Sequence, residues 1–122
     1  MSWITDNFKH FYPPEIGRYG NGRIAIEYSM FDPELGYPEP ACTATVNIPD
    51  AHLEDDEVII KDYSENEGIY ECMLAAGVIG PELRRVASGW ITCPVCKFIY
   101  KEPEVKVPDQ FDDTKFADEI AR

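Results

Sequence analysis

The sequence predicts an α+β fold, an antiparallel sheet of about four strands with one main helix packed on it and a possible short C-terminal helix. Three patterns lead to this prediction. Residues 23–31 alternate between apolar and polar side chains, which is typical of a half-buried strand. Residues 58–60 are apolar between charged neighbours, as in a buried strand. Residues 69–76 repeat apolar side chains at the spacing of an amphipathic helix.

Four segments are predicted strands. Residues 23–31 and 41–48 form a hairpin across the proline-rich connection 32–40, because prolines and glycine favour a loop there. Residues 57–61 form a short strand that can pair with this hairpin. Residues 90–100 form the last strand, which is apolar on both faces and is therefore expected at the centre of the sheet or covered on both sides.

The main helix has recognisable start and stop signals. Ser64 and Glu67 have the spacing of a capping box, in which each side chain accepts a hydrogen bond from the backbone N–H of the other residue. Gly77 is predicted to end the helix in the left-handed conformation. Gly80-Pro81 is predicted to turn the chain after the helix, and Ser88-Gly89 to open the last strand.

The chain divides into three parts. Residues 1–22 form an aromatic-rich segment, residues 23–100 the α+β core domain, and residues 101–122 a charged arm with two prolines. In this arm Phe111, Phe116 and Ile120 are spaced to form one short amphipathic helix.

Net charge is the most unusual bulk property. Twenty-three acidic and eleven basic residues give a net charge of −12, which disfavours direct binding to nucleic acid or to anionic membranes. An acidic surface attracts a protein with a basic surface, although the same charge also serves simple solubility. We predict that the partner-binding acidic face consists of Glu54, Asp55, Asp56, Glu57, Glu65 and Glu67.

The sequence has no signs of membrane insertion or secretion. No apolar run approaches the roughly 18 residues that a membrane span needs. The first ten residues lack a basic segment followed by an apolar core, so no secretory signal is visible. We therefore expect residence in a cytoplasm.

Cys93-Pro-Val-Cys96 is the one motif that resembles a metal-binding site. Two thiolates at this spacing can bind one zinc ion, but a structural zinc site needs two more ligands, and a second such pair is absent. A redox pair is expected at a helix N-terminus, whereas these cysteines lie in a predicted strand with their sulfur atoms on opposite faces. Structural cysteines, a zinc site and a redox pair remain as alternatives, and no cofactor is predicted.

No serine, histidine or glycine-rich loop has the context of a known catalytic motif. Ser64 is explained by its predicted capping role, and two histidines leave little scope for acid–base catalysis at neutral pH. The sequence is therefore predicted to be a non-enzyme.

Four segments in order are residues 43–49 (TATVNIP), 56–68 (DEVIIKDYSENEG), 76–79 (AGVI) and 88–96 (SGWITCPVC). Together they resemble a family of small uncharacterised proteins encoded by phages and mobile elements of bacteria. The resemblance spans about Gly22 to Phe98 and implies the α+β fold and a phage-like origin. It implies no catalytic residue.

These observations suggest a binding protein that acts on a host protein with a basic surface. Such a protein can inhibit a nucleic-acid-processing defence system, as anti-CRISPR and antirestriction proteins do, by presenting carboxylates in place of phosphates. The alternative is a metal-binding or small-ligand-sequestering domain without catalytic activity. The bacterial host cytoplasm is the expected location, and the oligomeric state is left open.

Overall fold

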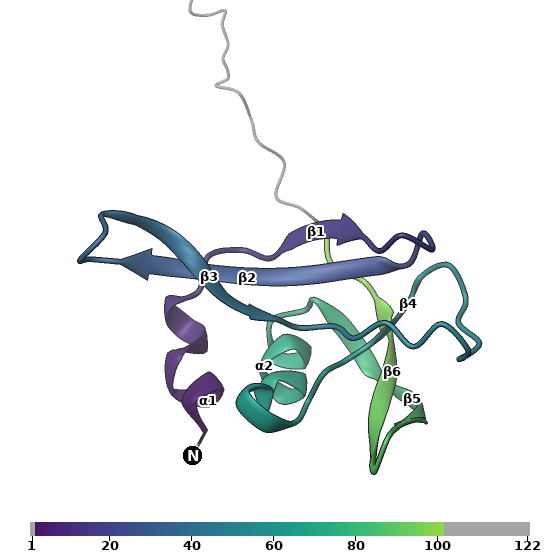
Figure 1. Ribbon diagram of the computed structural model, residues 1–122. Coiled ribbons are helices and arrows are strands. Elements are labelled where there is room, and N and C mark those ends of the chain that lie inside the picture. The colour runs from purple at the N-terminus through teal and green to yellow at the C-terminus, as the bar shows by residue number, and fades with distance from the viewer. Residues whose placement is uncertain (1, 102–122) are drawn as a thin grey trace, which may run out of the picture.

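The computed structural model describes residues 2–101 and has an α+β architecture with two antiparallel sheets of three strands each (Figure 1). The first sheet has the order β1-β2-β3, with β1 (Glu15–Arg18), β2 (Ile24–Asp32) and β3 (Tyr37–Thr43). The second has the order β4-β6-β5, with β4 (Glu57–Ile59), β5 (Ile79–Ser88) and β6 (Ile91–Phe98). Helical segments are α1 (Trp3–Asn7), the 3-10 turns η1 (Phe8–His10) and η2 (Ser64–Asn66), and α2 (Ile69–Ala75). The α+β class is confirmed, and the single sheet of four strands was wrong.

The predicted hairpin is present as β2 and β3, which pair in antiparallel fashion. The side chains of Ile24, Ile26 and Tyr28 in β2 are buried, as the alternation predicted. The second strand begins earlier than expected, because Pro38 and Pro40 lie inside β3 and not in the connection. Proline is tolerated there because β3 is an edge strand, in which an outward-facing N–H group has no strand to bond.

The predicted strand 41–48 is divided between the two sheets. Ala44 donates its N–H to the carbonyl of Ile26 in the first sheet (2.8 Å), and Val46 donates to Ile59 in the second (3.0 Å). Between them, Thr45 forms an isolated bridge with Ile60. The chain therefore crosses from one sheet to the other at this point. The predicted strand 57–61 does pair with the end of the predicted strand 41–48, through the bond of Val46, the bridge of Thr45 and the bond from the N–H of Lys61 to the carbonyl of Ala44 (2.8 Å), while β4 itself pairs with β6 in the second sheet.

β5 was missed by the sequence analysis. The predicted turn at Gly80-Pro81 lies within this edge strand, where the pairing with β6 shifts register on both sides of Glu82. The turn at Ser88-Gly89 is confirmed: Ser88 pairs with Ile91 across two residues, and Gly89 has a φ of 64°. The central position of the last strand is also confirmed, because β6 lies between β4 and β5.

Helix α2 begins with a different cap from the predicted capping box. Ser64 adopts a positive φ of 56° in η2, and no side chain of the Ser64–Glu67 pair caps the helix. Instead, one carboxylate oxygen of Asp62 accepts the N–H groups of Gly68 (3.0 Å) and Tyr70 (3.1 Å). This carboxylate bonds the otherwise unpaired N–H groups of the first turn, so the capping-box prediction was wrong.

The predicted end of α2 is confirmed. Gly77 has a φ of 77°, and its N–H bonds to the carbonyl of Leu74 at 3.2 Å. The N–H of Val78 bonds to the carbonyl of Met73 at 3.0 Å, which completes a Schellman motif. The glycine is required because a residue with a Cβ is disfavoured at this φ.

The main core lies between the first sheet, the helices and the second sheet, which contributes Val58, Ile79 and Cys96. Both α-helices lie on the same side of the first sheet (Figure 1), and Ile4 of α1 and Ile69 of α2 are fully buried there. The rings of Phe8 and Phe11 pack on Tyr28 of β2 with centroids 5.2 and 5.4 Å apart. The N-terminal aromatics thus extend the core. The predicted C-terminal helix falls outside the described residues. Within residues 2–101, no helix combines the length and apolar character needed to cross a membrane.

Candidate functional site

Glu57, one of the six predicted partner-binding acids, is buried in the structure. Its carboxylate accepts two hydrogen bonds from the guanidinium of Arg84, at 2.7 and 3.2 Å, and a third from the N–H of Glu54 at 3.0 Å. The Arg84 guanidinium, followed by the Glu54 N–H, lowers the pKa of Glu57 to about 2. The same guanidinium donates to the carbonyl of His52 (2.8 Å), so this ion pair ties the loop before β4 to β5.

The other predicted acids are exposed, but most have a basic neighbour. Asp56 pairs with Lys97 at 2.8 Å, Glu65 pairs with Lys61 at 2.7 Å, and Glu54 contacts His52 at 3.1 Å. Asp55 and Glu67 are exposed and belong to no ion pair among residues 2–101.

The structure also separates the predicted acids into two groups. Residues 54–57 precede β4 or begin it, whereas Glu65 and Glu67 follow its far end. The predicted acidic face is thus two groups at opposite ends of a strand, with much of its charge balanced locally.

Two further carboxylates without an ion pair among the described residues lie side by side on the first sheet. Residues 24–60 contain nine acids and no lysine or arginine. In the register of the sheet Glu15 of β1 lies directly opposite Glu27 of β2, and neither forms an ion pair within the described part of the chain. Directly opposed side chains have Cβ atoms about 5 Å apart, so the two negative charges repel each other.

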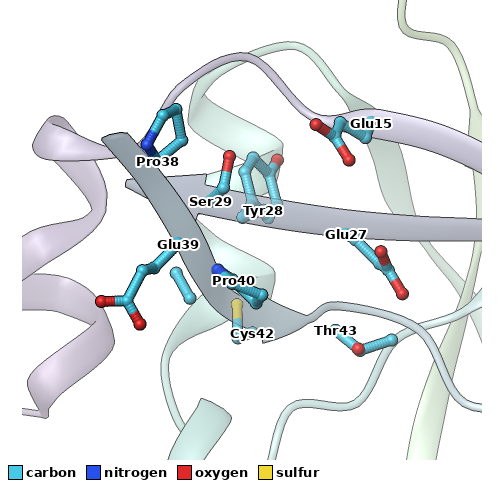
Figure 2. A pocket seen from close by; sticks show the side chains of 10 residues that line it. Glu15, Glu27, Tyr28, Ser29, Pro38, Glu39, Pro40, Cys42 and Thr43 are labelled. Atoms are coloured by element: carbon cyan, nitrogen blue, oxygen red, sulfur yellow. The ribbon is translucent and has the colours of Figure 1, made fainter. Parts of the chain in front are cut away.

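Glu15 and Glu27 border a surface hollow of about 370 Å³ between the strands of the first sheet (Figure 2). Thr43, the cross-strand neighbour of Glu27 on β3, is another lining residue. Glu39 also lines this hollow, and Figure 2 shows its carboxylate on the side of β3 nearer to α1. We call Glu15, Glu27 and Thr43 with this hollow the sheet site.

The chemistry of the sheet site favours a positively charged organic group. Two carboxylates and a hydroxyl offer oxygen acceptors for an ammonium or guanidinium group. A protein metal site needs more ligands than one carboxylate pair supplies. Among residues 2–101, no three or more His, Cys, Asp or Glu side chains converge in a way that holds a metal ion.

The sheet site was not predicted from the sequence. A signal was present in the sequence. Residues 24–60 contain no lysine or arginine, so an acid in this stretch can form an ion pair with lysine or arginine only outside it. The pairing of Glu15 with Glu27 had no such signal, because it depends on the register of β1 against β2.

Cys93 and Cys96, the cysteines of the motif that resembles a metal-binding site, are both buried, but they lie in different apolar clusters. Cys96 belongs to the main core beneath the first sheet, and Cys93 belongs to a second apolar cluster with Ile59 and Val95. Burial raises the pKa of both thiols, that of Cys96 to about 12, which disfavours the thiolate that zinc binding requires. This arrangement supports structural cysteines.

A second, apolar hollow of about 310 Å³ lies between the N-terminal segment and the end of α2. Its lining residues are mostly aromatic side chains and prolines: Phe8, Phe11, Tyr12, Pro13, Pro14, Tyr28, Ala76, Val78 and Tyr100. The buried hydroxyl of Tyr28 has no hydrogen-bond partner within the described residues.

Comparisons with protein-family models, with curated proteins and with solved structures gave no match.

Proposed function

We propose that this protein is a non-enzymatic binding protein that docks on a basic surface of another protein through the sheet site. The observation that carries the proposal is the direct opposition of Glu15 and Glu27, neither of which forms an ion pair among residues 2–101. Opposed like charges destabilise a sheet. A partner that places a cation between them removes this repulsion. The relief of the repulsion therefore adds favourably to the free energy of binding.

The proposed partner is a host protein that handles nucleic acid. Arginine and lysine side chains that bind phosphate also bind carboxylates, because both anions accept charge-assisted hydrogen bonds. A protein with a net charge of −12 that presents paired carboxylates competes with nucleic acid for such a surface. This competition would inhibit a host defence system, in the manner of anti-CRISPR and antirestriction proteins.

Capture from a nuclease-treated bacterial host lysate tests this proposal. The tagged wild-type protein should retain a basic protein at low salt and release it at high salt, because exposed charges are screened. The double variant E15K/E27K should lose the captured protein. The triple variant E54K/D55K/D56K provides the comparison, since it reverses charge on the loop that precedes β4.

Two outcomes would contradict the proposal. One is a wild-type protein that captures no basic partner. The other is capture that E15K/E27K leaves intact and E54K/D55K/D56K abolishes, which would place the contact on the loop before β4. Unfolding midpoints of both variants serve as the control for a correctly folded domain.

The apolar hollow favours a second candidate function, the sequestration of a small ligand. Its volume is at the lower end of the range for small-molecule sites. An aromatic ligand with one hydrogen-bond acceptor would suit the aromatic lining and the unpaired Tyr28 hydroxyl. Native mass spectrometry of the protein purified from its host would detect such a ligand, and Tyr28→Phe should then reduce its retention.

A further inference from the structure

A further hollow of about 380 Å³ lies where α1 meets the β2–β3 hairpin, and it shares Glu39, Pro40 and Ala41 with the hollow of the sheet site. Its apolar lining includes Trp3 of α1, Met30 of β2 and Pro40 of β3, and two carboxyl side chains, Asp32 and Glu39, complete it. Trp3 is 50% exposed although its ring packs on Phe11 at 5.8 Å. We call this hollow the hairpin site.

The hairpin site combines exposed apolar surface with uncompensated negative charge. Phe31, which also lines it, is 48% exposed, and a cluster of exposed large apolar side chains is typical of a protein-binding surface. Among residues 2–101, no lysine or arginine lines the hollow. The surface is therefore complementary to a partner group that is both long and positively charged.

Asp32 and Glu39 form a close carboxyl pair. One oxygen of Asp32 accepts the N–H of Glu34 at 2.8 Å, which fixes the side chain at the start of the hairpin turn. The hydrogen bond with Asp32 raises the pKa of Glu39, and the negative charge of Asp32 acts in the same direction. When both groups are ionised they repel each other, and a bound cation would relieve that repulsion.

The edge of β3 also restricts how a partner can bind. Pro38 and Pro40 lack N–H groups, so this edge cannot support the regular hydrogen bonding of an added strand. A partner at the hairpin must therefore make its contacts with side chains, and not by extending the sheet.

We propose that the hairpin site receives an arginine side chain of the basic protein partner. The planar guanidinium matches a pair of carboxylates and also stacks on an indole ring, which here are Asp32 with Glu39 and Trp3. Its aliphatic stem packs on Met30 and Pro40. This inference rests on the proposed function, and it names the anchoring contact at the β2–β3 hairpin.

Trp3 fluorescence provides the test, in a Trp90→Phe background that leaves one indole. Trp90 is fully exposed in the β5–β6 turn, so its replacement should leave the fold intact. The probe is a nine-residue peptide of alternating glycine and arginine, and the control is the same peptide with citrulline, which has the shape of arginine without its charge. We expect the arginine peptide alone to change the Trp3 emission.

The double variant D32N/E39Q should weaken binding of the arginine peptide about tenfold or more, because charge-assisted contacts are lost. The matched control is E34Q/D50N, which removes one glutamate and one aspartate charge from exposed positions outside both the hairpin site and the sheet site. It should weaken binding by less than about threefold, through long-range attraction alone. Circular dichroism and unfolding midpoints check that all variants are folded.

Several outcomes would overturn the inference: an equal response to the citrulline peptide, equal binding of a lysine peptide, no response of Trp3 to the arginine peptide, or a D32N/E39Q loss no greater than that of E34Q/D50N. These failures differ from failure of the proposed function. If D32N/E39Q binds the peptide normally while E15K/E27K releases the captured partner, the function stands and the arginine anchor does not. If the wild-type protein captures no basic partner, the function fails whatever the peptide does.

Discussion

Replacement of Glu57 by glutamine should destabilise the protein while keeping the shape of the side chain. Glu57 is 6% exposed, and its two carboxylate oxygens hold the Arg84 guanidinium at 2.7 and 3.2 Å. Glu57→Gln leaves the N–H of Glu54 with an acceptor but removes the negative charge that balances Arg84. The expected effect is therefore loss of an ion pair and not loss of packing.

The magnitude follows from the pKa of Glu57. Lowering this pKa from 4.5 to about 2 corresponds to about 3.4 kcal/mol in favour of the charged form. Arg84 is 40% exposed, so water screens part of this interaction, and we expect a loss of about 2 kcal/mol in the free energy of unfolding. For a chain of this size that loss lowers the melting temperature by about 10 °C.

Urea unfolding followed by circular dichroism measures this loss, with Asp56→Asn as the matched control. Asp56 lies next to Glu57, but its ion pair with Lys97 is half-exposed, so its replacement should cost less than about 1 kcal/mol. Because the folded state lowers the Glu57 pKa, the stabilisation is complete above pH 4.5 and is lost as pH falls toward 2. The wild type and Glu57→Gln should therefore converge in stability across that interval. A difference that stays constant from pH 7 to about pH 2, or a loss equal to that of Asp56→Asn, would refute the reasoning.

Three further predictions concern other parts of the molecule. Gly68→Ala should lose about 2 kcal/mol or more in urea unfolding, because φ is 96° and a Cβ would lie 2.6 Å from Thr5 Cγ2; Gly77→Ala, with a φ of 77° and open space around the site, should lose about 1 kcal/mol, and equal losses would contradict the steric argument. The Cys96 thiol should resist alkylation in the folded protein, because burial raises its pKa to about 12; mass spectrometry that finds it modified before unfolding would show this to be wrong. Binding of the arginine peptide should strengthen as pH rises through the raised pKa of Glu39 and then level off, and fluorescence titrations independent of pH would argue against a contact with this carboxyl group.

The sequence predicted well the elements whose signals are local. The alternation in residues 23–31 identified the buried face of β2, and the glycine at position 77 identified the end of α2. The predicted start of α2 failed for an equally physical reason. Ser64 and Glu67 have the spacing of a capping box, but α2 begins later, at Ile69, where the Asp62 carboxylate accepts the N–H groups of Gly68 and Tyr70.

Pairing between distant segments was not predictable in this way. Residues 41–48 read as one strand, yet Ala44 bonds to the first sheet and Val46 to the second, because each backbone group pairs with whichever strand lies beside it. β5 had no clear pattern, since an edge strand with exposed side chains on much of its length shows little alternation.

The sequence by itself determined the α+β class, the excess of negative charge and the stretch from residue 24 to 60 without lysine or arginine. Only the tertiary structure decided which carboxylates are balanced. Glu57 is neutralised by Arg84, 27 positions away, whereas Glu15 and Glu27 face each other across two strands. The physical reason is that electrostatic energy depends on distance in space, and the register of the sheets sets that distance.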